Sequence, residues 1–380
     1  MHHVITANQF DHVAKGYSTD PLDTQSLRAE AYTQGRWFDI DQQEIIAKSW
    51  QWVCHVEKLR DPGSYTTATI AGNPVAVVRG KDGVLRAFHN VCKHRAHPVL
   101  AGEGKVSRIV CPYHAWCYGL DGSLAAAPQV GHLKNFSKAD IHLEPVQVEE
   151  FCGFVFVNLD LEARPLRETS GDLAQEILGW APDIGQLTFG HRLTYTIRSN
   201  WKNVVDNFLE CYHCPSSHRD FVTLVDMDTY KVTTHGIYSS HMAEAGHGAN
   251  SAYDTSAAKV RTHAVWWLWP NTCLMRYPGR SSMIVLHIIP VGPDLTLETY
   301  DFFLETPEAD AMELEAIRYL DEVLQAEDIA IVENVQRGMN SPAFDQGRIV
   351  ADPAGSGLSE HALHHFHGLV LDAYRGAIAP

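Results

Sequence analysis

Two short motifs, each with one cysteine and one histidine, constrain this 380-residue chain more than any other feature. Cys92-Lys93-His94 is followed after 16 residues by Cys111-Pro112-Tyr113-His114. Zinc-finger spacing places both cysteines in one half of the site and both histidines in the other, so a zinc site is the weaker alternative. Here each half supplies one of each, which suits a two-iron cluster with thiolates on one iron and imidazoles on the other.

The segment around these motifs has the pattern of a small β domain. The stretches 65–70, 74–79 and 84–90 are short and rich in β-branched residues, and Gly-Asn and Asp-Gly turn signals separate them. A further Asp-Gly pair at 121–122 follows, and an apolar stretch at 154–159 closes the region. We therefore predict an antiparallel β domain over about residues 62–160.

The rest of the chain mixes helices and strands without regular alternation, which predicts an α+β fold. Thr306-Pro307 is a candidate helix start, because an N-cap residue is followed by proline. The helix that it opens is expected to reach about Met339, and Ser359-Glu360 is expected to open the last helix.

Charge and cysteine usage exclude several classes of protein. The formal net charge of −16 disfavours binding to nucleic acid and to anionic membrane surfaces. No apolar stretch approaches the roughly 20 residues of a membrane-spanning helix, and the first residues lack the apolar region of a signal peptide. We expect a cytoplasmic protein whose eight cysteines are reduced, metal-bound or buried.

A second cluster of metal-ligand residues begins at Asp206 and continues with Glu210, His213 and His218. The first three fall at helical positions i, i+4 and i+7, on one face. The two histidines point about 140° apart on an unbroken helix, so they cannot share a metal there. Pro215 lies between them and should end or distort the helix, which lets His218 turn back toward His213. Two imidazoles and one carboxylate would form a site with open positions for O₂.

Together the two clusters resemble those of Rieske non-haem iron oxygenases, over nearly the whole chain from Trp50. The resemblance includes further residues beside the first cluster. Two alanines, Ala96 and Ala115, stand where the family usually has glycine, and Cys117 stands where threonine or serine is common. We expect these departures to alter the loops or the hydrogen bonds to cluster sulfur without removing a ligand. The other matching residues are Asn90, Arg95, Trp116, Tyr118, Asp121 and Gly122.

The resemblance also implies ligands and cofactors. Cys92, His94, Cys111 and His114 would hold a [2Fe-2S] Rieske cluster. His213, His218 and Asp328 would hold a mononuclear Fe(II), with Glu327 as the alternative carboxylate. Glu210 would link a Rieske histidine, His114, of one subunit to His213 of its neighbour in a homotrimer, and Asp206 would support that link. Electrons would come from an NAD(P)H-dependent reductase of flavin or ferredoxin type.

The family also implies a domain plan. Residues 1–45 would form a helical segment that packs on the catalytic domain. Residues 46–160 would form the Rieske domain, and residues 161–380 a helix-grip-like catalytic domain with a central antiparallel sheet.

The substrate is predicted from a resemblance to one branch of this family, the quaternary-ammonium oxygenases that act on betaines, carnitine or stachydrine. Glu210, where many family members have aspartate, and the tryptophan-rich stretch 266–271 carry it. Trp267 and Trp269 share a strand face and could hold a trimethylammonium group, and Arg276 could hold a carboxylate. The expected reaction is hydroxylation beside nitrogen, leading to N-demethylation or C–N cleavage. An aromatic-ring-hydroxylating oxygenase and a non-catalytic electron-transfer protein are the alternatives.

Four histidines, His361, His364, His365 and His367, cluster at helical spacing near the C-terminus and could indicate another metal site. No cysteine or carboxylate except Glu360 lies at ligand spacing, so we interpret the four as packing and hydrogen-bonding residues.

Overall fold

The computed structural model describes residues 3–248 and 250–379. The chain divides into two compact units. One comprises residues 46–169, and the other combines residues 1–45 with 170–380. The smaller unit includes helix α4 (Leu166–Thr169), which begins at the carboxylate of Glu149 and lies beyond the expected boundary at residue 160. The placement of the domain boundaries stays a prediction.

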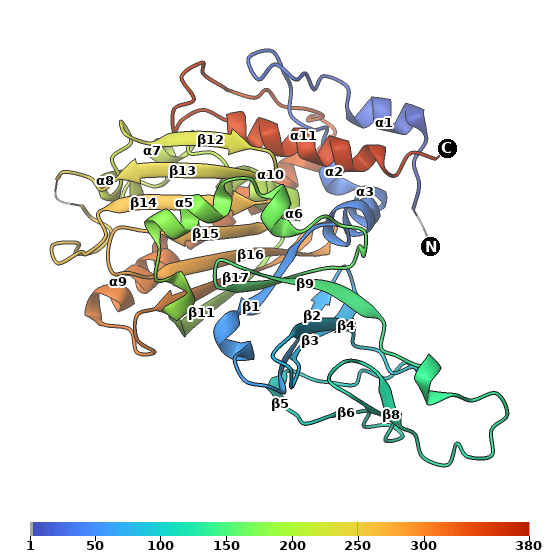
Figure 1. Cartoon of the computed structure of the whole chain (residues 1–380). Coiled ribbons are helices and arrows are strands. Elements are labelled where there is room, and N and C mark those ends of the chain that lie inside the picture. Colours follow the sequence, from blue (N-terminus) through green and yellow to red (C-terminus); the bar gives the residue numbers. More distant parts are fainter. Residues whose placement is uncertain (1–2, 249, 380) are drawn as a thin grey trace. The chain divides into compact units, whose positions relative to one another are not determined.

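The smaller unit is an antiparallel β domain (Figure 1). Its main sheet has seven strands in the order β1-β10-β9-β4-β3-β2-β5, and a second sheet has the order β6-β7-β8. The strands are β1 (Gln51–His55), β2 (Ser64–Ile70), β3 (Asn73–Arg79), β4 (Leu85–His89), β5 (Glu103–Lys105), β6 (Ile109–Val110), β7 (Cys117–Tyr118), β8 (Leu124–Ala126), β9 (Pro145–Phe151) and β10 (Phe154–Asn158). Short 3₁₀ helices cover Val56–Leu59 and Lys138–Asp140.

The hairpins form where the turn signals stand. Gly72 and Gly83 adopt positive φ angles of 73° and 78°, which glycine reaches without a steric penalty. The core between the two sheets includes Val78, Phe88 and Tyr118, and both cysteines of the first motif pair, Cys92 and Cys111, are buried in it.

The larger unit is built on one seven-stranded antiparallel sheet with the order β11-β17-β16-β15-β14-β13-β12. The α+β class with antiparallel sheets is therefore confirmed. The strands are β11 (Thr188–Ile197), β12 (Lys231–His235), β13 (Tyr238–Glu244), β14 (Thr262–Leu268), β15 (Thr272–Arg276), β16 (Met283–Gly292) and β17 (Leu295–Leu304).

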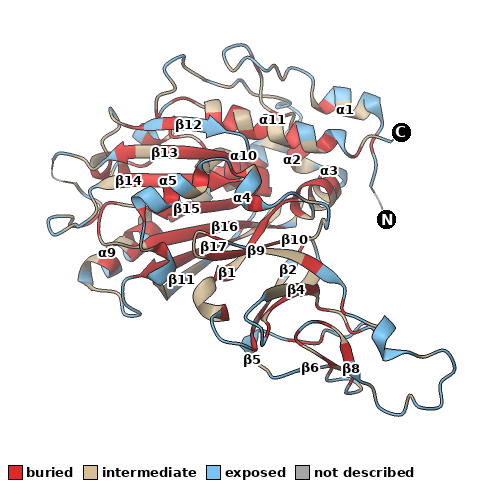
Figure 2. Cartoon of the chain, in the orientation of Figure 1, coloured by how far each residue is buried: buried red, intermediate tan, exposed pale blue. Residues whose placement is uncertain are grey.

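Helices cover both faces of this sheet, so its central strands are buried (Figure 2). On one face, Glu176 of α5 (Leu173–Trp180) accepts hydrogen bonds from Tyr238, Ser240 and Trp266. On the other face, Phe366 of α11 (His361–Arg375) packs on Trp267 and on Trp201 of α6 (Trp201–Phe208). Alternate strand residues therefore face different layers.

The long C-terminal helical stretch begins later than predicted. Asp310, not Thr306, caps α9 (Ala311–Tyr319), because its side chain accepts from the Glu313 N–H and the Glu313 side chain accepts from the Asp310 N–H. A π-helical turn at Leu320–Leu324 joins α9 to α10 (Gln325–Met339), so the predicted end at Met339 agrees with the structure.

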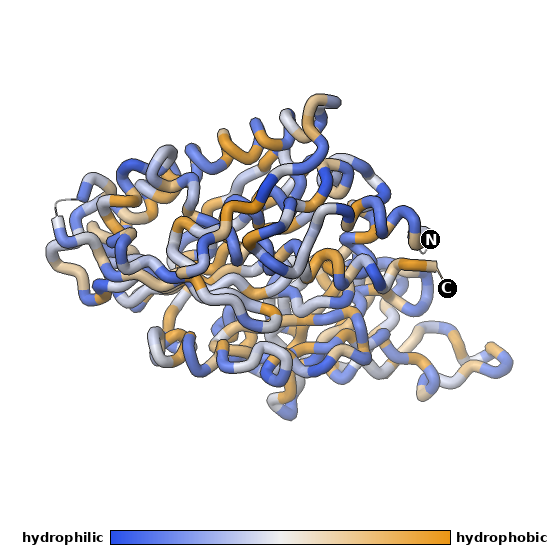
Figure 3. Tube along the Cα trace, turned by 90° about the horizontal axis from the view of Figure 1, so that it is seen from above, coloured by the Kyte–Doolittle hydropathy of each residue, from blue (hydrophilic) through white to orange (hydrophobic). Residues whose placement is uncertain are grey.

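The remaining elements are short. They are α1 (Ala7–Val13), α2 (Glu30–Thr33), α3 (Gly35–Ile40), a π-helical turn (Asp41–Ile46), a 3₁₀ turn (Ile184–Gln186), α7 (Cys214–Ser217) and α8 (Phe221–Leu224). Apolar stretches along the trace are brief and interrupted by hydrophilic residues (Figure 3). Across the described residues, no helix combines the length and the apolar character needed to cross a membrane.

Candidate metal centres and substrate cavity

The two Cys/His motifs lie on two loops with the same backbone conformation. In each loop an alanine adopts positive φ, 59° at Ala96 and 57° at Ala115. In each loop this alanine also donates its N–H to the carbonyl of the motif's cysteine, Cys92 at 2.9 Å and Cys111 at 3.0 Å. The left-handed conformation explains why glycine is common at these two positions in the family, because alanine pays a steric cost there.

The donor atoms of the loops fit a metal cluster. Cys92 and Cys111 are each 2% exposed, and the rings of His94 and His114 lie 4.6 Å apart. The Nδ1 atom of His114 is buried and has no hydrogen-bond partner in the described part of the chain. A buried ring nitrogen without a partner is costly unless a ligand such as a metal uses it. The donor set therefore suits a cluster held by two thiolates and two imidazoles.

Neighbouring side chains hold the cluster ligands in place. The Tyr118 hydroxyl lies 3.3 Å from Cys92 Sγ and accepts a hydrogen bond from the Lys93 N–H. The ring of Trp116 stacks on His94 with the centroids 5.0 Å apart. Cys117 begins β7 and is half-buried. Tyr118, one of the matching residues beside the motifs, thus places a hydroxyl next to a ligating sulfur, where it tunes the redox potential of a cluster.

The second cluster of metal-ligand residues lies just beyond α6. The predicted continuous helix through His213 is wrong, because α6 ends at Phe208 with Leu209 as its C-cap. Glu210 and His213 therefore lie in the following turn. Pro215 is the second residue of the short helix α7, which begins at Cys214, and it does not terminate a long helix; His218 is the C-cap of α7.

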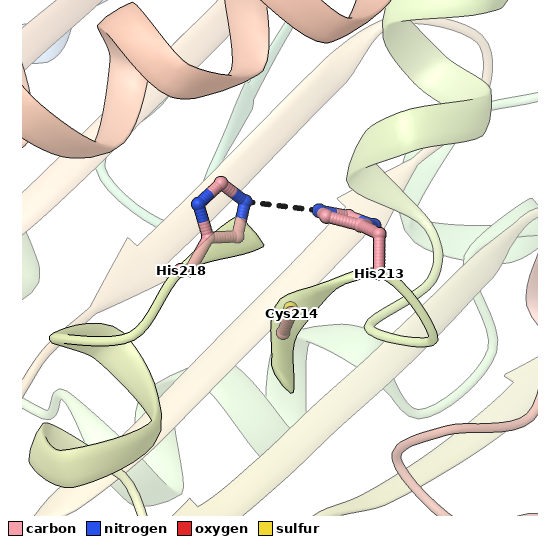
Figure 4. A group of neighbouring side chains, drawn as sticks. All are labelled: His213, Cys214 and His218. Atoms are coloured by element: carbon pink, nitrogen blue, oxygen red, sulfur yellow. Dashed lines mark hydrogen bonds between the residues drawn. The ribbon is translucent and has the colours of Figure 1, made fainter. Parts of the chain in front are cut away.

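Two imidazoles and one carboxylate converge on a single point. The Nε2 atoms of His213 and His218 face each other at 3.0 Å (Figure 4). Asp328 of α10 places Oδ1 3.0 Å from His218 Nε2 and 3.6 Å from His213 Nε2. Three donor atoms about 3 Å apart can all reach one ion at the roughly 2.0–2.2 Å typical of nitrogen and oxygen ligands. This geometry fits a 2-His-1-carboxylate iron site.

Two further carboxylates bind the far side of the imidazoles. Glu210 Oε1 lies 2.5 Å from His213 Nδ1, and Glu327 Oε2 lies 2.8 Å from His218 Nδ1. The structure thus separates the two acids of α10, because Glu327 contacts the outer nitrogen of His218 and Asp328 the inner one. Carboxylates in this position fix the orientation of a metal-binding imidazole.

The site is strongly acidic. Burial opposes a charge on His213, but hydrogen bonds to Asp328 and Glu210 outweigh burial and raise its pKa to about 10. Burial likewise opposes the charge on Asp328, but hydrogen bonds to both histidines lower its pKa to about 2. An environment that stabilises positive charge this strongly suits a divalent cation.

Cys211 and Cys214 flank His213 and differ from expectation. They form a disulfide across the turn, with their Cα atoms 4.9 Å apart, whereas the sequence predicted reduced, metal-bound or buried cysteines. Cys214 also lies near the two histidines (Figure 4). Its sulfur is bonded to Cys211, so Asp328 is the third donor that is free to bind a metal.

Asp206 is held by two donors from distant segments. The Tyr32 hydroxyl donates to Asp206 Oδ2 at 2.7 Å, and His367 Nε2 lies 3.0 Å from Oδ1. The Leu27 N–H donates to His367 Nδ1, so the proton of the neutral ring is on Nε2 and points to Asp206. His361, His364 and His365 bond to the carbonyls of Val232, Ser18 and Gly236.

A cavity adjoins the candidate iron ligands. The side chains predicted to contact substrate do not line it. Trp267 is fully buried against Phe366, and Trp269 packs beside both rings. Arg276 donates to the Trp180 carbonyl and to Ser281 Oγ. Helix and strand packing uses all three side chains, and their contact with substrate stays a prediction.

Other aromatic residues line the cavity, and no motif in the sequence pointed to them. The set combines aromatic rings, two buried histidines and a buried acid, namely Phe208, Phe221, Tyr230, Tyr277, Tyr300, His241, His263 and Glu298. Alternation along β14 could have indicated His263, since it shares a face with Val265, which also lines the cavity.

Two family models match the chain. The Rieske [2Fe-2S] domain matches residues 49–137, and the catalytic domain of the ring-hydroxylating alpha subunit matches residues 184–376.

Curated relatives match over most of the chain. The carnitine monooxygenase oxygenase subunit of Escherichia coli K12 is 37% identical over 95% of this chain and 97% of its own length. The chloroplastic choline monooxygenase of Spinacia oleracea is 32% identical over 91% of this chain and 78% of its own.

Solved structures are similar in fold. The structure of a quaternary ammonium Rieske monooxygenase has a TM-score of 0.89 at 34% identity, covering 98% of this chain and all of that one. Naphthalene 1,2-dioxygenase from Rhodococcus has a TM-score of 0.78 over 92% of this chain and 94% of its own, at 20% identity, which shows a common fold alone.

Proposed function

Because the chain belongs to the Rieske oxygenase family of ring-hydroxylating alpha subunits, we propose that it is the terminal oxygenase of a system that hydroxylates a quaternary ammonium compound. The observation that carries this proposal is the aromatic, acidic cavity beside His213, His218 and Asp328. Aromatic faces attract trimethylammonium groups, and carboxylates offset their charge. The relatives that act on carnitine and choline support the same substrate class.

The ligand assignments follow from the donor sets. Cys92, His94, Cys111 and His114 would hold the [2Fe-2S] cluster. His213, His218 and Asp328 would hold the mononuclear iron. When bound, the cluster supplies electrons one at a time and the iron supplies a centre that activates O₂.

The chain's own residues orient this site. Glu210 and Glu327 accept the Nδ1 protons of His213 and His218, which leaves both Nε2 lone pairs free to face the position where Asp328 would also bind the metal. Tyr32 and His367 hold Asp206. We assign to Glu210 the further task of linking His213 to His114 of a neighbouring subunit in a homotrimer, with Asp206 as its support.

The overall reaction balances with an external electron source. One O₂, two electrons and two protons hydroxylate a carbon beside nitrogen and release water. The cationic hemiaminal product then breaks its C–N bond and yields a tertiary amine, an aldehyde and a proton. As an oxygenase subunit the protein needs a reductase, for which an NAD(P)H-dependent flavin or ferredoxin-type enzyme is the expected source.

A substrate screen tests the proposal. The iron-loaded enzyme and a surrogate reductase are supplied with quaternary amines or with aromatic acids, and O₂ consumption and aldehyde are measured together. We expect consumption coupled to aldehyde with at least one quaternary amine. Coupled turnover of aromatic compounds alone would instead favour a ring-hydroxylating oxygenase.

A further inference from the structure

Three carboxylates line the cavity. They are Glu210, Glu298 and Asp328. Among the residues that the structure describes, no lysine or arginine lines the cavity. The nearby cations are used elsewhere, since Lys202 pairs with Asp41 and Arg276 binds a carbonyl and a hydroxyl.

Glu298 is the acid that the metal site does not account for. It lies on β17, is 2% exposed, and accepts a hydrogen bond from the side-chain amide of Gln325. The Tyr300 hydroxyl donates to the Gln325 carbonyl oxygen at 2.6 Å, so the amide is fixed with its N–H toward Glu298. No ion pair to Glu298 occurs within residues 3–248 and 250–379.

A buried acid without a cationic partner is expensive. Burial raises the pKa of Glu298 well above its usual value. A cation that binds in the cavity would recover this cost, because it would supply the missing opposite charge. The rings of Tyr277 and Tyr300, which line the same cavity, add cation–π attraction.

His263 adds a different kind of contact. It is 2% exposed, and both of its ring nitrogens lack a hydrogen-bond partner in the described chain. Its ring packs among Phe221, Tyr230 and Tyr277. Burial lowers its pKa to about 3, so the ring is neutral and presents one donor and one acceptor. A hydroxyl can bond to either nitrogen, as an acceptor from the N–H or as a donor to the bare nitrogen, whereas a carboxylate can only accept.

We propose that Glu298 is the counter-ion of the substrate's ammonium group, and that the rest of the substrate is uncharged, as in an ammonium alcohol, and carries no carboxylate. This inference rests on the proposed function and narrows its substrate class. It excludes the carboxylate contact that the sequence had predicted for Arg276, because Arg276 bonds to the Trp180 carbonyl and to Ser281, and no arginine or lysine among the described residues lines the cavity to pair with a carboxylate.

Anaerobic titration calorimetry on the iron-loaded enzyme tests, without turnover, whether a carboxylate on the ligand weakens binding; we call this expectation the charge rule. Choline is compared with glycine betaine, and γ-butyrobetaine methyl ester with γ-butyrobetaine, so that each pair differs in the carboxylate charge. In each pair we expect the compound without a carboxylate, choline or the methyl ester, to bind at least about tenfold more tightly. Equal or tighter binding of the carboxylates would overturn the inference.

The role of Glu298 is tested by Glu298→Gln, which keeps the shape and removes the charge. We expect the Kd of choline to rise about tenfold. The Kd of its neutral isostere, in which tert-butyl replaces trimethylammonium, should stay unchanged. Glu176→Gln makes the same change on the other face of the sheet and should leave both values unchanged. An unchanged Kd for choline in Glu298→Gln would refute the counter-ion role.

The two proposals fail in different ways. If carboxylated amines bind best and turn over, the charge rule fails and the proposed function stands. If no quaternary amine binds or supports coupled O₂ consumption, the proposed function itself fails and the charge rule falls with it.

Discussion

The ion pair between Lys202 and Asp41 gives the clearest stability prediction. Both side chains are fully buried, and Asp41 also accepts hydrogen bonds from Trp201 Nε1 at 2.9 Å and from the Tyr374 hydroxyl at 2.7 Å. The pair therefore joins the N-terminal segment to α6 and α11. Lys202→Met would leave the Asp41 carboxylate buried without a counter-charge.

Removal of one partner of a buried pair costs about 3–5 kcal/mol. The two remaining hydrogen bonds to Asp41 place the expected loss toward the lower end of this range. For a unit of this size, about 2–4 °C of melting temperature is lost per kcal/mol, so a loss of about 3–4 kcal/mol predicts a drop of about 6–16 °C. Differential scanning calorimetry of the whole protein measures this drop.

Two control variants separate the buried charge from other effects. Lys259→Met breaks an exposed pair with Glu305 and should cost no more than about 1 kcal/mol. Asp41→Asn combined with Lys202→Met removes both charges and should recover part of the loss. A loss below about 1 kcal/mol in Lys202→Met, or no recovery in the double variant, would refute the reasoning.

Three further predictions concern other parts of the molecule. Ala115→Gly should stabilise the smaller unit by up to about 1 kcal/mol, because relief of the positive φ outweighs the added freedom of the unfolded chain; calorimetry showing a loss would contradict this. Tyr32→Phe removes a donor to Asp206, so kcat should fall while metal analysis finds both centres loaded; a normal kcat would count against the support role. Burial raises the pKa of Glu360 to about 7, so the stability that this group contributes should be lost as pH rises from about 4.5 to 7. At pH 8, urea unfolding should find Glu360→Gln more stable than the wild type by about 1–2 kcal/mol, a value that allows for the partial exposure of the group. Equal stability of the two proteins would refute the assignment.

The metal-ligand residues could be proposed from the sequence because their chemistry is local. The Cys-x-His and Cys-x-x-His spacing pointed to a two-iron cluster, and the structure brings His94 and His114 together. Asp328 came from a resemblance, and its approach to both His213 and His218 depends on the packing of α10, which spacing alone does not reveal.

The sequence-based predictions differ from the structure where tertiary packing decides where a helix ends or what a side chain contacts. The helix predicted through His213 ends at Phe208, since helical periodicity of polar residues does not specify where a backbone turns. Trp267 and Trp269 looked like a cation site, but α11 covers their face of the strand with Phe366. Glu298 and His263 carry no motif, and only the closed sheet places them on the cavity.

A single-turnover experiment tests the central claim most directly. The Rieske cluster is reduced, a quaternary amine that passed the screen and O₂ are added, and cluster absorbance and product are followed in the wild type and in Asp328→Ala. Wild type should reoxidise its cluster and form product. Asp328→Ala should keep an intact cluster, because the cluster ligands lie on other segments. That cluster should stay reduced and no product should form, because the variant lacks a ligand of the iron that would take the electron. Product from Asp328→Ala, or reoxidation of the wild type without product, would contradict the account.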